Sequence, residues 1–409
     1  MDESAMHANR RRALHGLIAK LHSLQRAPQA ERFLALQIQE ELLDRNRRAE
    51  RCVRLSRVKV SALKDRLKAR GHDREMVRSI RSQIAAAEAQ ADDAKAWIET
   101  LKSLGDSIAY IHADRFDLKP LAFRPSPGFL TGKSGARLER KILRAAFAMG
   151  AVAVLNDLTH TLRHGDLTVF RNDGKFMLIE AKSGRGGQRA RAERQLAAAR
   201  EMTGYLESDE RHDETGDWYR VEAAAHLSDH GARATQMAAR LTSGAWVHEE
   251  VEQGLHYVLI DCGVEEGGVD EALSSLAGRR LMGVLINQIK RERLGYTPFT
   301  LTFGDADVAT RFYAGDFVMN VFVDLDVVAA RLGDRGFAME VTDDPDRLWR
   351  IAPLGLAKGS FEGISYASFH LIGRLGAEFV TLDWLLATIM APILPNLIER
   401  LSSAVATQG

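Results

Sequence analysis

The chain has 409 residues, 45% hydrophobic and 27% charged, with a net charge of +1. This composition is typical of a globular protein with two or three domains. The most apolar stretch, Phe379 to Ile398, contains Asp383 and two prolines, so we expect a buried helix there and no membrane span. The N-terminus has no apolar segment behind its arginines, which argues against a secretory signal. Cys52 and Cys262 are the only cysteines, which fits a reducing cytoplasm and leaves no thiolate zinc site.

The small net charge hides two halves of opposite sign. Residues 1–200 contain 39 Lys and Arg against 23 Asp and Glu, a net charge of +16, whereas residues 201–409 carry −15. A basic half can bind a polyanion, because each neutralised phosphate releases condensed counterions. The alternative is that the two halves complement each other within one molecule or oligomer, and charge alone does not decide between them.

Residues 1–104 are predicted to form a helical arm. Leucines at 14, 17, 21 and 24 have the spacing of one helix face, Pro28 interrupts, and a second apolar series follows from residue 33 to 67. Gly71 is expected to end the second helix and Asp73 to cap the third. Such helices predict a coiled coil or hairpin, with a homo-oligomer formed through the exposed apolar faces. The alternative is a bundle that folds back on its own chain.

After the arm, the prolines and glycines of residues 105–134 predict a linker. Residues 135–206 predict a helix, one or two strands, a hairpin and a further helix, and 207–217 an acidic loop. We expect a separate α/β domain at 218–409. Its predicted elements are helices at 230–243 and 270–293, strands at 255–261, 298–303, 317–325 and 336–342, and a mostly helical segment at 361–404.

The chemically informative segment runs from Asp166 to Lys182. Asn172-Asp173-Gly174 is a strong turn signal between two apolar runs, so residues 166–171 and 175–182 are predicted to pair as an antiparallel hairpin. In the second strand Glu180 and Lys182 face the same side, because side chains alternate along a strand. Asp166 starts the first strand at the same open end. The hairpin therefore predicts two carboxylates and an ammonium group close together.

That trio suits metal-dependent hydrolysis of a phosphodiester. Two carboxylates bind a hard divalent ion, Mg²⁺ or Mn²⁺, through oxygen, and the ion polarises the phosphate and lowers the pKa of a bound water. A lysine can orient that water and stabilise negative charge in the transition state. The tripeptide acid-x-Lys is common by chance, and only 180–182 ends an apolar strand paired with a strand that starts at an Asp.

The segment 135–205 resembles the PD-(D/E)XK nuclease superfamily. The family's metal-binding Asp falls on Asp166 and its E-x-K on Glu180-Ala181-Lys182. The resemblance implies that the Ala181 carbonyl completes the metal shell, that Glu139 in the first helix supports the site, and that Gln195 lies beside the lysine. Gly165 stands where the family often has proline. The implied fold is α/β, a restriction-endonuclease-like core with a mixed sheet flanked by helices.

A glycine-rich and then basic segment follows the predicted site directly. It contains Arg185, Arg189, Arg191 and Arg194, which are expected to contact nucleic-acid phosphates. The alternative for this segment is a flexible loop that leads into a solvated helix face.

Together these features predict a cytoplasmic, Mg²⁺-dependent nuclease, most simply a DNA endonuclease, and the family association suggests bacterial antiviral defence or restriction. The competing hypothesis is non-enzymatic: a catalytically silent nuclease-like scaffold that binds nucleic acid or assembles partners through its coiled coil. An ion bound between Asp166 and Glu180 would distinguish the two.

Overall fold

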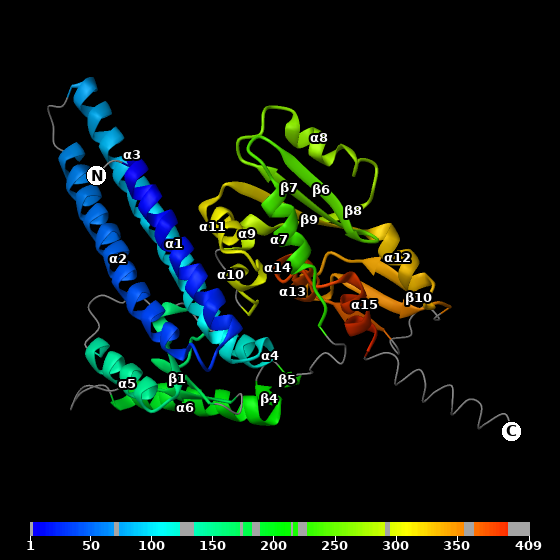
Figure 1. Cartoon of the computed structure of the whole chain (residues 1–409), viewed down its shortest axis with the longest axis horizontal. Helices are drawn as coiled ribbons and strands as arrows, with labels where there is room; N and C mark the ends of the chain where they lie inside the picture. Colours follow the sequence, from blue (N-terminus) through cyan, green and yellow to red (C-terminus); the bar gives the residue numbers. More distant parts are fainter. Residues whose placement is uncertain are drawn as a thin grey trace. The chain divides into compact units, whose positions relative to one another are not determined.

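The computed structural model describes residues 3–68, 73–122, 135–171, 175–181, 189–213, 216–219, 227–290, 295–355 and 364–391. Within these residues the chain is a mixed α/β protein with antiparallel sheets (Figure 1). It divides into two compact units: unit 1 consists of Met1–Tyr219 with Arg291–Leu301, and unit 2 of Arg220–Lys290 with Thr302–Gly409. Among the helices of these ranges, none is both long and apolar enough to cross a membrane.

Three long helices form the first part of unit 1: α1 (Glu3–Arg26), α2 (Arg32–Lys68) and α3 (Arg74–His112). Asp73 caps α3 as predicted, accepting a hydrogen bond from the Met76 N–H at 2.7 Å. Helix α1 packs on both α2 and α3 (Figure 1), and its four spaced leucines are at most 3% exposed. The apolar face of α1 is therefore covered within one chain, so it supplies no argument for a second subunit. The homo-oligomer stays a prediction.

The expectation of a linker at 105–134 is wrong for residues 105–122. Helix α3 continues to His112 and is followed by α4 (Arg115–Leu118) and the 3₁₀ helix η1 (Lys119–Ala122). The reason is burial: apolar residues keep the spacing of a helix face through this segment, and glycine and proline are accommodated within it. The fully buried side chains include Leu104, Ile108, Ala109, Leu118 and Leu121. Residues 123–134 lie outside the described part of the chain.

A small antiparallel sheet packs beside these helices. Its strands lie in the order β1 (Val152–Leu155), β2 (Leu167–Phe170) and β3 (Phe176–Ile179). The resemblance implied a mixed sheet, but the described strands of this sheet pair only in the antiparallel sense. A hairpin also stands where an acidic loop was expected. The remaining elements are α5 (Ala136–Ala148), η2 (Asn156–Leu158), α6 (Arg189–Ser208), β4 (Glu210–Asp213) and β5 (Gly216–Tyr219).

A buried glutamine joins the helices to the edge of this sheet. Gln39 on α2 is fully buried; its Nε2 donates to the Ala153 carbonyl at 2.8 Å, and its Oε1 accepts the Leu155 N–H at 2.9 Å. The side-chain amide thus takes the place of a neighbouring strand on the free edge of β1. Without it, two backbone groups of β1 would be buried without a hydrogen bond, which is costly.

Unit 2 is built on a second antiparallel sheet in the order β6-β7-β9-β8. Strand β7 is buried at every position, because it lies inside the sheet with helices against it. Four aromatic rings, those of Tyr257, Phe303, Phe312 and Phe379, form the centre of its core. The sheet strands are β6 (Trp246–Glu252), β7 (Leu255–Asp261), β8 (Leu281–Leu285) and β9 (Phe317–Asp324).

A second sheet of unit 2 has the order β10-β11-β12. It contains β10 (Phe337–Val341), β11 (Trp349–Pro353) and β12 (Ser365–Ala367). The helices assigned to this half of the chain are α7 (Gly231–Arg240), α8 (Gly268–Ser274), α9 (Ile286–Ile289), α10 (Phe299–Thr302), α11 (Ala306–Ala314), α12 (Leu325–Gly333), η3 (Pro345–Arg347), α13 (Phe369–Ile372), α14 (Arg374–Ala377) and α15 (Leu382–Met390).

The sequence correctly predicted α7, β7, β9 and β10 in this half of the chain. Two other predicted elements, the helix at 270–293 and the strand at 298–303, are wrong. The expected helix at 270–293 contains strand β8, whose apolar residues pair with β9 instead of continuing a helix face. Gly283 allows a close approach to the neighbouring strand, because a Cβ there would lie 2.9 Å from the Phe322 ring. The expected strand at 298–303 is the short helix α10. Strand β6 was missed, because its charged and half-buried pattern carries little apolar signal.

Substitution of Gln39 tests the junction between α2 and β1. Gln39→Leu should lower the free energy of unfolding by about 1–3 kcal/mol for each of the two backbone groups left unbonded, offset in part by burial of the leucine. Gln83→Leu is the matched control, because Gln83 is exposed on α3. Urea unfolding of both variants checks this, and equal stabilities would contradict the assignment.

His112 at the end of α3 predicts a pH effect on stability. Burial lowers the pKa of His112 to about 4, and its ring lies 6.0 Å from that of Phe170. A lowered folded-state pKa means that the unfolded chain binds more protons between about pH 6.5 and 4. Stability is therefore lost as the pH falls through this window, by no more than about 3 kcal/mol from this group.

His112→Phe keeps the ring and removes the proton site. The difference in unfolding free energy between the variant and the unchanged protein should grow in favour of the variant from pH 7 to pH 4.5. A difference that stays constant over this range, measured by urea unfolding, would rule out the titration of His112 as its source.

Candidate functional site

The hairpin that carries the candidate site pairs in the predicted register. Leu167 lies opposite Ile179 and Phe170 opposite Phe176, and the Arg171 N–H bonds to the Lys175 carbonyl at 2.7 Å. The predicted turn at 172–174 lies outside the described residues. The register places Asp166 just before β2 and Glu180 just after β3, both at the open end of the hairpin.

Gly165 has a conformation that only glycine adopts easily. Its φ is +75°, and a Cβ there would lie 2.8 Å from the Ile179 carbonyl oxygen. Proline fixes φ near −65°, so it cannot occupy this position in the observed backbone. Glycine at position 165 thus has a physical reason: the chain turns tightly against β3 immediately before Asp166.

Asp166 is held against the backbone of the second strand through two hydrogen bonds. Its N–H donates to the Ile179 carbonyl at 2.8 Å, and its Oδ2 accepts the Ala181 N–H at 2.7 Å. The carboxylate therefore lies beside the peptide bond that joins Glu180 to Ala181. The Asp166 and Glu180 side chains are both half-buried at this end of the hairpin.

Glu139 reaches the same region from helix α5. It is 9% exposed, and a Cβ built on Gly135 would lie 2.8 Å from Glu139 Oε1 and 4.0 Å from the Ala181 carbonyl oxygen. Both oxygens thus lie near Gly135, the residue immediately before α5. Asp166 and Glu139 therefore both lie near the Ala181 backbone, and Glu180 is adjacent to it in the chain.

The loop before Asp166 is fixed by a buried asparagine. Asn156 Nδ2 donates to the carbonyls of His164 at 2.7 Å and Gly165 at 3.2 Å, and its Oδ1 accepts the Thr168 hydroxyl at 2.9 Å. Its backbone N–H donates to the Asp166 carbonyl at 3.0 Å. One side chain therefore ties η2 to both flanks of Asp166, which limits the positions that the carboxylate can take.

A buried aspartate on α3 anchors the start of the same loop. Asp106 Oδ1 accepts the N–H groups of His160 at 3.0 Å and Thr161 at 2.8 Å. Burial raises the pKa of Asp106, while the nearby His160 and the N–H groups of Thr161 and His160 act in the opposite direction. Neighbouring Gly105 allows this approach, because a Cβ there would lie 1.9 Å from the Leu158 carbonyl oxygen.

Several predicted site residues cannot be placed. Lys182 and Arg185 lie outside the described residues. The backbone of α6 contains the positions of four others, but the structure describes nothing of their side chains; these are Arg189, Arg191, Arg194 and Gln195.

The residues present fit a hard divalent ion in part. Within the described ranges, no group of three or more acidic, histidine or cysteine side chains could hold a metal ion by itself. Magnesium does not require such a cage, because it is usually bound by one or two carboxylates and keeps several waters. Asp166, Glu180 and the Ala181 carbonyl offer a donor set of that kind, all of it oxygen.

No sequence motif indicated the residues that support the site. Asn156 and Asp106 belong to no recognisable sequence motif, and Asp106 lies in the segment 105–134 that was predicted to be a linker. The available signal for Asp106 was its place in an unbroken apolar series, because a lone acid on a buried helix face must find hydrogen-bond donors. Gln39 carried the same signal on α2.

Replacement of Asp106 tests its role as the anchor of the loop. Asp106→Ala leaves the N–H groups of His160 and Thr161 buried without an acceptor, which should cost about 1–3 kcal/mol for each group. Asp106→Asn is the matched control, because its Oδ1 can still accept both bonds. Thermal unfolding and amide hydrogen exchange at residues 160–161 should show the larger loss for alanine. Equal losses in the two variants would contradict the assignment.

We compared the chain with protein-family models, curated proteins and solved structures, and none of the three comparisons found a match.

Proposed function

We propose that unit 1 is a nuclease that hydrolyses phosphodiester bonds of nucleic acid, most simply DNA, with Mg²⁺ or Mn²⁺ as its cofactor, and that it has a restriction-endonuclease-like core. The observation that carries the proposal is the Asp166–Ala181 hydrogen bond, which holds a carboxylate at the middle residue of the Glu180-Ala181-Lys182 motif. The chain between Asp166 and Ala181 forms the predicted hairpin.

Two further features support this function. Glu139 Oε1 and the Ala181 carbonyl oxygen both lie near Gly135. Glu139 is therefore a third acid in this region, besides Asp166 and Glu180, and it does not take part in the Asp166–Ala181 hydrogen bond. The loop that carries Asp166 is bonded to Asn156 and Asp106, so the carboxylate is held by buried groups. Catalytic side chains need such support, because small displacements greatly reduce the rate.

The roles proposed for the side chains follow from their chemistry. Asp166, Glu180 and the Ala181 carbonyl would bind the ion, which when bound polarises the phosphate and acidifies a water molecule. Glu139 would accept a hydrogen bond from a water at the edge of the site. Lys182 would orient the attacking water and stabilise negative charge on the phosphate oxygens. Gln195 remains a proposed catalytic residue beside Lys182, and Arg185, Arg189, Arg191 and Arg194 remain proposed contacts to nucleic acid.

The lysine provides a sharp test of catalysis. The purified protein is incubated with plasmid, linear duplex, single-stranded DNA and RNA, with Mg²⁺ and with a chelator. Lys182→Ala should lower the cleavage rate by about 10²–10³-fold, because the lysine acts on the transition state, and should leave binding nearly unchanged. Lys175→Ala, at the opposite end of the same hairpin, is the matched control and should cleave normally. Near-normal cleavage by Lys182→Ala would exclude the catalytic role.

The carboxylates provide a test that does not require activity. Calorimetric titration with Mn²⁺ should show one site that is lost in Asp166→Asn and in Glu180→Gln. Asp65→Asn, which changes an exposed acid on α2, should bind the ion normally. If the unchanged protein binds no ion and cleaves no substrate, the scaffold hypothesis is favoured over the nuclease.

A further inference from the structure

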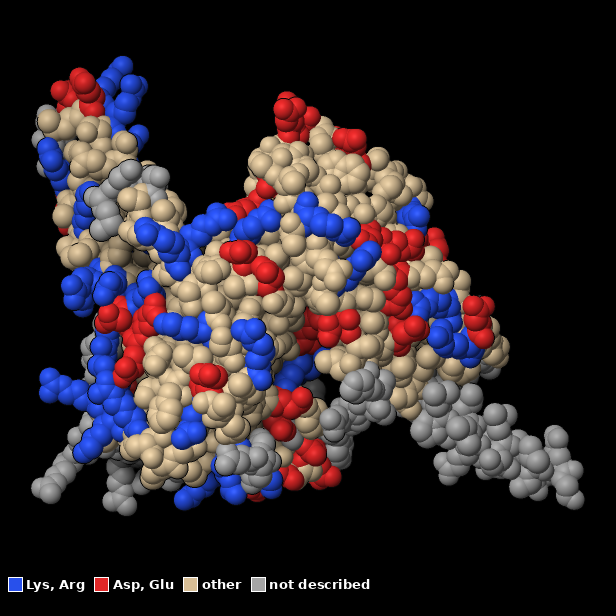
Figure 2. All heavy atoms as spheres, in the orientation of Figure 1, with Lys and Arg blue, Asp and Glu red and all other residues tan. Residues whose placement is uncertain are grey.

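Helix α5 presents a cationic face that no motif indicated. Arg137, Arg140, Lys141 and Arg144 are three or four residues apart, so they lie on one side of the helix. Together they line a hollow of about 270 Å³, and all of its lining residues are cations. Figure 2 shows Lys and Arg gathered over the end of unit 1 that carries this helix. Glu139 lies on the opposite, buried side of α5.

Three of these cations have no acidic partner in the part of the chain that the structure describes. Arg144 pairs with Glu40, with Nε at 2.9 Å and Nη2 at 2.5 Å from Glu40 Oε1. No ion pair is formed there by Arg137, Arg140 or Lys141. The hollow therefore carries a local excess of positive charge on residues that are exposed or half-exposed.

This arrangement lowers the stability of the free helix. Like charges three and four residues apart repel each other and destabilise a helix. Arg137 also lies in the first turn of α5, where the helix dipole favours anions over cations. An anion in the hollow would offset the repulsion between the cations and would itself be favoured by the helix dipole, so the face is suited to a bound polyanion.

The chemistry of the hollow favours nucleic acid over a protein or a membrane surface. A protein or membrane partner would be expected to meet apolar side chains, and none lines the hollow. From Arg137 to Arg144 the helix advances by about 10 Å, which is about three nucleotide steps of 3.4 Å along the axis of a DNA duplex. The same helix begins beside the Ala181 carbonyl, so a strand that follows α5 leads to the candidate site.

We propose that Arg137, Arg140, Lys141 and Arg144 form a contact for the phosphate backbone of duplex DNA, next to the candidate nuclease site. The proposal rests on the proposed function for its substrate class. It assigns DNA binding to helix α5, which precedes the β2–β3 hairpin, in addition to the basic segment after Lys182.

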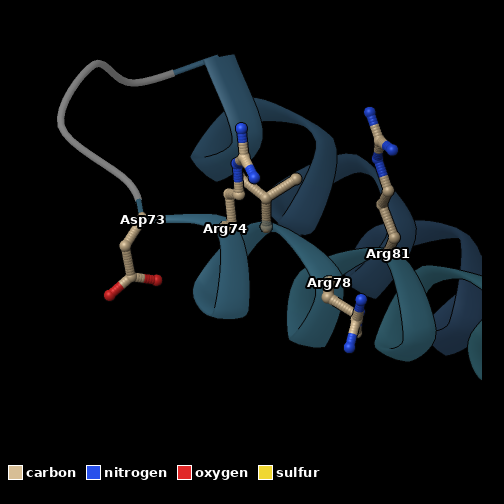
Figure 3. Close-up of a pocket in the computed structure, with 5 residues that line it drawn as sticks. Asp73, Arg74, Arg78 and Arg81 are labelled. Carbon is tan, nitrogen blue, oxygen red and sulfur yellow. The ribbon is translucent and has the colours of Figure 1, made fainter.

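The tip of the helical arm offers a matched control. Arg74, Arg78 and Arg81 line a second hollow near the start of α3, together with Asp73. Figure 3 shows that Arg74 and Arg78 project to different sides of the helix and that Asp73 lies beside them. Removal of these three charges changes the net charge of the protein by the same amount as removal of three from α5.

The experiment measures binding of a short fluorescein-labelled duplex by anisotropy, with a chelator present so that cleavage plays no part. The unchanged protein, the α5 variant (Arg137→Gln, Arg140→Gln, Lys141→Gln) and the arm variant (Arg74→Gln, Arg78→Gln, Arg81→Gln) are compared between about 50 and 200 mM salt. For the α5 variant, the slope of log affinity against log salt should fall by about 0.9 for each phosphate that the variant no longer neutralises. Its thermal unfolding temperature should stay the same or rise.

The outcomes separate this inference from the proposed nuclease function. A shallower slope in the α5 variant alone supports the inference, even if the unchanged protein cleaves nothing with Mg²⁺. An unchanged slope in the α5 variant overturns it, even if cleavage depends on Lys182. An equal decrease of the slope in the two variants also overturns it, because the effect would then follow net charge instead of this face.

Discussion

Gly105 brings helix α3 so close to the Leu158 carbonyl that a single methyl group would lie 1.9 Å from its oxygen. This close approach allows Asp106, one residue later, to accept the N–H groups of His160 and Thr161. From there the chain runs through a short loop to Asp166. The long helix and the carboxylate of the candidate site are thus connected by buried hydrogen bonds, and the position of the carboxylate depends on how tightly α3 packs.

Buried hydrogen bonds and packing also explain why the long helices and the small sheet belong to one compact unit. A three-stranded sheet has free edges and too little apolar surface to be stable alone. Gln39 occupies the backbone groups at one edge, and α2, α3 and α5 cover the strands. The helices that looked like an independent arm are therefore part of the support for the hairpin. Substitutions that disturb the packing of these helices should therefore also affect the hairpin.

The charges in unit 1 are arranged in two opposed groups on one helix. On its buried side α5 directs Glu139 toward the Ala181 carbonyl, and on its outer side it presents cations. An acidic centre that binds a cation and a basic surface that attracts a polyanion have opposite requirements. The cations thus lie on the opposite face of α5 from Glu139.

The sequence by itself determined the elements whose signals are local. The leucine spacing of α1, the cap at Asp73 and the pairing of β2 with β3 each depend on residues close together in the sequence, and the structure agrees with them. The neighbourhood of Asp166 and Glu180 followed from the hairpin alone. Tertiary structure decided the rest, because burial of a polar group depends on distant partners: Asp106 lies 54 residues from His160, and Gln39 lies 116 residues from Leu155. It also turned the expected helix at Leu281–Leu285 into strand β8, since an apolar run of that length takes the form that its neighbours allow.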